Sequence, residues 1–157
     1  MQSDRTFALM SLHPRFAERI LRGEKRVEFR KARLPSTVST VIIYATRPVG
    51  RIIGAFSVAG IDEGHPEELW ERHKAYAGVG EAFFRKYFEG RNRGFAIRVG
   101  ETLQLNEPRS ISAVRADPPQ SFCYLRERDV RRLLADAKAT APEGSNSNLH
   151  LPSFARR

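Results

Sequence analysis

Lys25, Glu28 and Arg30 place an ammonium, a carboxylate and a guanidinium close together in the chain. Apolar residues alternate with charged ones over 25–31, which predicts a β-strand with one buried and one charged face. Glu28 and Arg30 then share a face, and Lys25 lies where the strand begins. A carboxylate accepts a hydrogen bond from the amino group of a base, and Lys and Arg bind phosphate or carbonyl oxygens. The three residues are therefore predicted to line a ligand cleft; the alternative is a structural ion pair of small energetic weight.

The chain is strongly basic, and its basic residues gather around this strand. Twenty-seven Lys and Arg stand against 18 Asp and Glu, and 22 of the 27 are arginine, whose guanidinium pairs with phosphate and stacks on bases. Between positions 15 and 33, eight basic residues accompany three acidic ones, which is typical of a phosphate-binding surface. The alternative is a solvated helix face that serves solubility. The basic residues predicted to bind nucleic acid are Arg15, Arg19, Arg22, Lys25, Arg26 and Arg30.

The elements that position these residues are predicted to be short strands with helices inserted between them. Strands are expected at 7–12, 25–31, 41–46, 51–61, 94–99 and 101–105, with a weaker one at 111–114. Helices are expected at 14–22, 66–76, 81–88 and 122–137, the last with Ser121 as its N-cap. Because strands and helices do not alternate regularly, the pattern favours an α+β barrel over a doubly wound sheet.

The length of 157 residues suits one domain, which we expect to span 1–138. From 139 to 157 the chain is rich in Gly, Ser, Asn and Pro, which predicts a flexible tail. No apolar run approaches the roughly 20 residues of a membrane span, so we expect no membrane partner. The single cysteine and the absence of a secretory pattern at the start favour the cytoplasm.

The segment 21–30, Leu-Arg-Gly-Glu-Lys-Arg-Val-Glu-Phe-Arg, resembles the signature of the ASCH family, G-x-K-x-x-E-x-R after a short helix. The segments 44–50, 54–56 and 118–122 look like those of small bacterial members, so the resemblance covers about 7–125. It implies a PUA-like β-barrel of about six strands with inserted short helices and a C-terminal helix, and a cleft beside the motif strand. ASCH domains are generally described as RNA-binding modules or coactivator domains.

The first functional hypothesis is a nucleic-acid-binding module with a regulatory role in transcription, for which RNA is favoured and DNA is the alternative. Its site would combine the basic residues with Glu28, with Tyr44 and Arg47 as base-stacking candidates, and with Ser121. A protein-interaction domain with incidental charge is a further possibility. The type of nucleic acid recognised and the oligomeric state stay open.

The second hypothesis is a hydrolase acting on RNA or a modified nucleoside, as the resemblance implies for some small members. Lys25 would serve as base or nucleophile only if burial lowered its pKa far below about 10.4. Glu28 or Glu81 would supply a carboxylate, although the cytidine-hydrolysing members carry Thr where this chain has Glu28. The four histidines and one cysteine show no metal-ligand spacing, and no phosphate loop or dinucleotide fingerprint occurs, so we expect no metal or cofactor.

Overall fold

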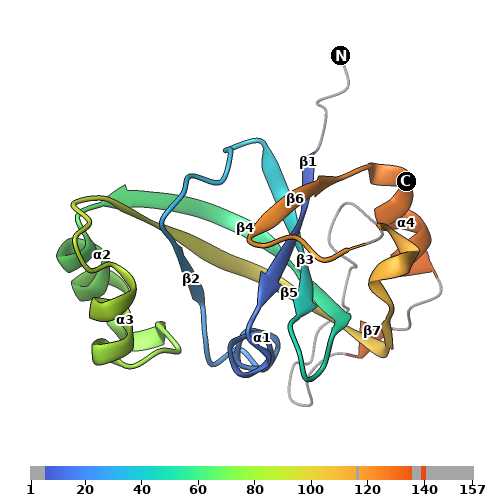
Figure 1. Ribbon diagram of the computed structural model, residues 1–157, viewed down its shortest axis with the longest axis horizontal. Helices are drawn as coiled ribbons and strands as arrows, with labels where there is room; N and C mark the ends of the chain where they lie inside the picture. Colours follow the sequence, from blue (N-terminus) through green and yellow to red (C-terminus); the bar gives the residue numbers. More distant parts are fainter. Residues whose placement is uncertain (1–5, 116, 136–138, 141–157) are drawn as a thin grey trace.

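The computed structural model describes residues 6–115, 117–135 and 139–140 (Figure 1). Over these residues, seven strands form one mixed sheet in the order β2-β5-β4-β3-β1-β6, with β7 paired to β5. β1 and β3 are parallel, and the other pairs are antiparallel. The strands are β1 (Thr6–Leu12), β2 (Val27–Arg30), β3 (Val38–Ala45), β4 (Arg51–Gly64), β5 (Gly94–Arg109), β6 (Phe122–Leu125) and β7 (Ala139–Thr140). The helices are α1 (Pro14–Leu21), α2 (Pro66–His73), α3 (Glu81–Tyr87) and α4 (Glu127–Ala135), with 3-10 turns η1 (Lys74–Tyr76) and η2 (Ile111–Ala113).

The sheet curls like a barrel but stays open along one side. β4 and β5 pair over most of their lengths, and their register shifts three times, between Ile52 and Gly60, where irregular pairing bends the strands. β2 and β6 are the two ends of the strand order, and no backbone pairing joins them within the described residues. We call the opening between β2 and the β1–β6 pair the seam. The predicted α+β, barrel-like architecture is thus confirmed, with an open rather than a closed sheet.

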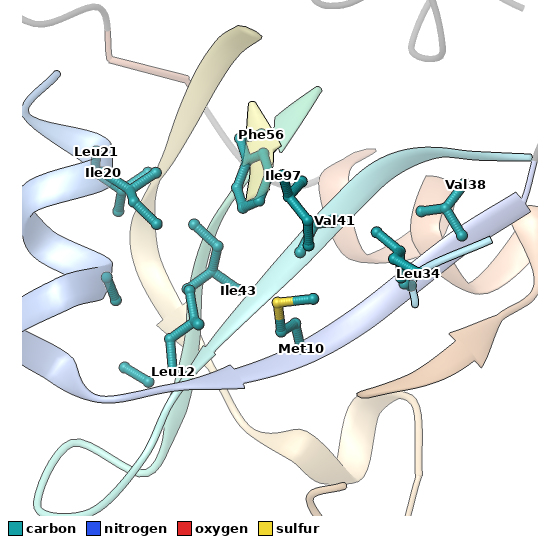
Figure 2. Packing of buried hydrophobic residues seen from close by; sticks show 13 residues of the cluster. Met10, Leu12, Ile20, Leu21, Leu34, Val38, Val41, Ile43, Phe56 and Ile97 are labelled. Atoms are coloured by element: carbon teal, nitrogen blue, oxygen red, sulfur yellow. The ribbon is translucent and has the colours of Figure 1, made fainter. Parts of the chain in front are cut away.

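Alternation along the strands divides the core between the two faces of the sheet. On β1, Ala8 and Met10 join a cluster that α1 covers with Ile20 and Leu21 (Figure 2). Phe7 and Leu9, whose side chains point to the opposite face, join a second cluster, which α4 covers. Successive strand residues point to opposite faces, so one strand serves both cores. A third cluster packs α2 and α3 against β2 and β5.

α1 leads the chain directly into the motif strand. His13 is its N-cap, and Nδ1 of His13 accepts a hydrogen bond from the Arg15 backbone N–H at 3.1 Å. Pro14 follows as the first helical residue, where a missing N–H costs nothing. The helix ends before Gly23, whose φ of 79° is the left-handed conformation typical of a helix end. β2 begins four residues later, so the seam lies next to α1.

The C-terminal part differs from the prediction. The predicted strands 94–99 and 101–105 form one continuous strand, β5. The strand predicted at 111–114 is instead the 3-10 turn η2, over Ile111–Ala113. The predicted helix 122–137 starts as strand β6, because Phe122–Leu125 pairs with the free edge of β1; α4 begins only at Glu127, so Ser121 is not its N-cap. Two residues of the predicted tail form β7 on β5, and 141–157 lies outside the described residues. No helix within the described part has the length and apolar character needed to cross a membrane.

Candidate functional site

A pocket of about 180 Å³ opens at the seam, and we call it the seam pocket. Residues from β1, α1, β2 and α3 surround it, together with the segment before α3. Its walls are mainly aromatic and aliphatic, and its polar groups come from the motif strand and from the end of β1. The lining residues are Ser11, Leu12, His13, Phe16, Lys25, Glu28, Phe29, Arg30, Val79, Phe83, Phe84 and Tyr87.

Lys25 is buried in the pocket wall, with 1% of its surface exposed. Its Nζ donates a hydrogen bond to the carbonyl oxygen of Ala77 at 2.6 Å and lies 3.6 Å from Oε2 of Glu28. The side chain packs against Gly78, where an added Cβ would lie 2.5 Å from the Lys25 stem. Burial lowers the pKa of Lys25 below its ordinary value of 10.5, and the nearby Glu28 carboxylate partly offsets that effect. The ammonium is therefore fixed in place at a strongly desolvated position.

Glu28 and Arg30 form the rest of the polar group. Oε1 of Glu28 lies 3.5 Å from Nε of Arg30, so the carboxylate has a cation on each side. Both ion-pair distances exceed the roughly 2.7–2.9 Å of a charge-assisted hydrogen bond, which leaves the carboxylate able to accept from a ligand. Nη1 of Arg30 donates to Oγ of Ser121 at 3.2 Å, and Nη2 donates to the backbone oxygen of Ser11 at 3.0 Å.

Nε of Arg30 is a buried donor without a hydrogen-bond acceptor among the described residues. A buried donor without a hydrogen bond is unusual in a folded protein, and the Glu28 carboxylate at 3.5 Å offsets its desolvation only in part. Arg30 is also one of the residues that line the seam pocket.

Aromatic rings form the outer wall. Phe16 and Phe83 meet edge to face with ring centres 5.3 Å apart, and 48% of the Phe83 surface is exposed. The Arg15 guanidinium lies over the Phe16 ring at 5.1 Å, and the Lys31 ammonium lies over the Tyr87 ring at 4.7 Å. The wall thus offers flat apolar surface with cations beside it, as sites that stack bases do.

The structure brings some of the predicted site residues together and separates others. Lys25, Glu28 and Arg30 line the pocket, and Ser121 contacts Arg30 from outside it. Arg19 is half-buried and donates to the Gly78 backbone oxygen at 2.7 Å, which supports the pocket wall.

The remaining predicted basic residues lie outside the pocket lining. Arg22 pairs with Glu24 at 3.3 Å on the surface. Arg26 lies 4.4 Å from the Tyr76 ring centre, and Arg47 is exposed in the turn after β3.

Two predictions differ from the structure. Tyr44 is only 6% exposed because it belongs to the second core cluster, so its ring is not accessible for stacking on a base. Glu81 is exposed at the start of α3, outside the pocket lining, and pairs with Arg85 at 3.0 Å. It is therefore not the carboxylate that accompanies Lys25. Among the described residues, no group of three or more His, Cys, Asp or Glu side chains is placed to hold a metal ion.

The site predicted from the sequence does not include Ser11, His13 or Phe16, nor Phe83 and Tyr87, whose aromatic run is more typical of core packing. His13 and Ser11 flank the end of β1, and α3 reaches the pocket only through tertiary packing. The His-Pro pair marks the start of α1, but its spacing from the motif strand does not reveal that His13 and the strand reach one pocket.

Comparison with solved structures places this fold among known domains. The crystal structure of ASCH from Zymomonas mobilis superimposes with a TM-score of 0.78 at 34% identity, covering 86% of this chain and 98% of that one. The N-terminal domain of Staphylothermus marinus McrB shares the fold with a TM-score of 0.56 at 11% identity, covering 83% and 94%.

The sequence comparisons then identify the family. The model of the ASCH domain matches residues 10–109, so the chain belongs to the ASCH family. A relative from Zymomonas mobilis, called an ASCH domain-containing ribonuclease, is 36% identical over 137 residues, which cover 84% of this chain and 93% of the relative. The family predicted from the motif strand is confirmed.

Proposed function

We propose that this ASCH protein binds RNA by taking a single base into the seam pocket. The observation that carries the proposal is the buried Nε of Arg30, which lacks an acceptor among the described residues and lies 3.5 Å from Oε1 of Glu28. A donor and an acceptor therefore stand side by side. The edge of a nucleobase also carries neighbouring donors and acceptors, and would satisfy both groups at once.

The aromatic wall supports the same proposal. A base that enters beside Phe16 and Phe83 would cover apolar ring surface that is now partly exposed. Stacking on one aromatic side chain is worth about 1–3 kcal/mol per base. Arg15 and Lys31, which lie over two of the lining rings, would meet the phosphates on either side of the base. The preference for RNA over DNA rests on the relative that is called a ribonuclease.

Binding is tested with labelled single-stranded RNA and with duplex DNA of the same sequence, by fluorescence anisotropy. We expect Arg30→Ala to weaken RNA binding at least tenfold, since about 1.4 kcal/mol is tenfold and a charge-assisted bond exceeds it. Arg72→Ala is the matched control, because Arg72 is an exposed arginine of α2 outside the pocket. Equal affinity of both variants for RNA would contradict the proposal.

Cleavage of RNA is the second candidate, and His13 and the relative called a ribonuclease favour it. In the neutral ring, Nδ1 of His13 accepts from the Arg15 backbone, so Nε2 carries the proton. The imidazolium form of His13, in which Nδ1 gives up that hydrogen bond, would protonate the departing 5′-oxygen from Nε2 and end as the neutral ring, while the Glu28 carboxylate or the amine form of Lys25 takes the proton of the attacking 2′-hydroxyl. The products would be a 2′,3′-cyclic phosphate and a 5′-hydroxyl end.

The test of cleavage separates turnover from binding. His13→Asn keeps a side chain suited to the N-cap but cannot transfer a proton. We expect it, and Lys25→Ala, to retain RNA affinity within a few fold and to lose turnover by about a hundredfold or more. A 2′-deoxy substitution at the cleaved nucleotide should block the reaction. Binding without turnover in the parent protein would leave the binding proposal standing and reject the second candidate.

A further inference from the structure

A second cavity, of about 380 Å³, lies between the segment after η2, β6 and the start of α4. It is lined in part by Arg115, Tyr124, Arg126 and Asp129. All four residues come after position 109, where the match to the ASCH family model ends. This site is therefore a feature of the C-terminal part of the chain, which packs on the family fold through β6 and α4 (Figure 1).

Tyr124 is the most exposed large hydrophobic residue among those described, with 56% of its surface accessible. It lies on β6, an edge strand that pairs with β1 along one side. Its neighbours Cys123 and Leu125 point to the second core cluster, so the pleat turns Tyr124 the other way. Its ring meets Phe122 edge to face at 6.0 Å, which holds the phenol in place and leaves a ring surface free. An exposed, supported ring of this kind is a platform for stacking a base.

The cavity lining carries two arginines, Arg115 and Arg126, and two aspartates, Asp117 and Asp129, so it offers cations for phosphates without a net positive charge. Arg115 and Arg126 make no ion pair with any residue that the structure describes. α4 adds Arg128 and Arg132, both exposed to solvent. Guanidinium groups that find no ion-pair partner among the described residues suit phosphate contact, and an aromatic ring beside them suits base stacking. A carboxylate such as Asp129 accepts from base amino groups.

β6 connects this cavity to the seam pocket. The strand begins immediately after Ser121, whose Oγ accepts from Arg30 in the seam pocket. Its last residue, Leu125, lines the second cavity. The four steps from Ser121 to Leu125 cover about 13 Å at about 3.3 Å per residue. A short single strand of nucleic acid can span this distance.

We propose that the Tyr124 ring and the Arg126 guanidinium, at the rim of the second cavity, form a second nucleotide subsite, which holds another base of the same RNA strand. The inference rests on the proposed function, because the strand must first engage the seam pocket. The RNA strand would then run along β6 from one subsite to the other. A base would stack on Tyr124, and its phosphates would face Arg126 and Arg115.

The experiment measures affinity against RNA length by fluorescence anisotropy, using a nucleoside monophosphate and RNAs of about four and about eight nucleotides, within the range that one small domain contacts. We expect the parent protein to bind the longer RNAs more tightly than the monophosphate. Tyr124→Ala should lose about tenfold in affinity for the longer RNAs and nothing for the monophosphate. Tyr124→Phe should restore binding, because the ring is kept.

Tyr76→Ala is the control, since Tyr76 is a comparably exposed tyrosine outside both cavities. Unchanged length dependence in Tyr124→Ala, with RNA still bound, would overturn the second subsite and leave the seam pocket intact. An equal loss for the monophosphate and the longer RNAs would also overturn it, since Tyr124 would then act on the seam pocket or on the fold. A parent protein that binds none of these ligands would refute both proposals. Binding of a protein partner through Tyr124, without binding of RNA, would overturn the subsite and identify this surface as a protein-binding one.

Discussion

Arg30 and Ser121 connect the two edges of the open sheet, although they are 91 positions apart in the chain. Nη1 of Arg30, at the end of β2, donates to Oγ of Ser121, immediately before β6, at 3.2 Å. A second bond from Nη2 reaches the Ser11 backbone on β1. Where a closed barrel would have a ladder of backbone hydrogen bonds, the described residues bridge the seam through the Arg30 side chain. The bridge therefore links the two edges without closing the sheet.

This bridge predicts a measurable coupling. Ser121→Ala should lower the free energy of unfolding by about 1 kcal/mol, the usual net worth of one hydrogen bond. Arg30→Ala should lower it by about 1–3 kcal/mol, since it also leaves the buried Glu28 with one cation fewer. Urea unfolding of both single variants and the double variant gives the coupling energy, which we expect to be near 1 kcal/mol. If the decreases in unfolding free energy of the two single variants sum to that of the double variant, the hydrogen bond between Arg30 and Ser121 contributes nothing to stability.

The buried ammonium of Lys25 predicts how stability depends on pH. Because burial lowers its folded-state pKa, the unfolded chain binds more protons than the folded one between that lowered pKa and 10.5. Stability contributed through Lys25 should therefore rise with pH across this window and level off near 10.5. The measurement is the difference in unfolding free energy between the parent and Lys25→Met at successive alkaline pH values. A difference that stays constant would contradict the assigned direction.

Gly78 predicts a localised effect on the pocket wall. Its φ of 66° is left-handed, and an added Cβ would lie 2.5 Å from the Lys25 stem. Gly78→Ala should destabilise the protein by the roughly 1–2 kcal/mol of a left-handed non-glycine residue, plus the cost of displacing Lys25. Gly90→Ala is the control, because Gly90 has a φ of 74° and open space around it. Thermal unfolding should rank Gly78→Ala clearly below Gly90→Ala, and equal values would mean that Lys25 moves aside freely.

The basic surface predicts steep dependence of RNA affinity on salt. Each phosphate contact releases condensed counterions, so several contacts should reduce affinity by orders of magnitude between about 50 and 200 mM salt. Removing an exposed arginine that meets a phosphate, such as Arg15→Ala, should lower the slope of log affinity against log salt by about one. A flat response over this range would exclude a phosphate-binding face.

The local elements around the motif were predictable from the sequence. The alternation over 25–31 and the His-Pro start of α1 are read from neighbouring residues, because strand and helix periods act over a few positions. The motif strand also identified the family, and with it the barrel-like fold. The grouping of Lys25, Glu28 and Arg30 in one pocket followed from that strand, since its spacing alone puts their side chains within reach of one another.

What surrounds those three residues was decided by tertiary structure. Tyr44 is read as an accessible aromatic from its position before a turn, yet the face of β3 that carries it is covered by the second core cluster. The segment after Ser121 is helical by local pattern, but the free edge of β1 recruits Phe122–Leu125 as a strand and so brings Ser121 to Arg30. His13 and Phe83, 70 positions apart, line one pocket only because tertiary packing brings α3 next to the end of β1. Local sequence carries the periods of the elements, whereas burial and long-range pairing depend on which surfaces are left to be covered once the whole chain has folded.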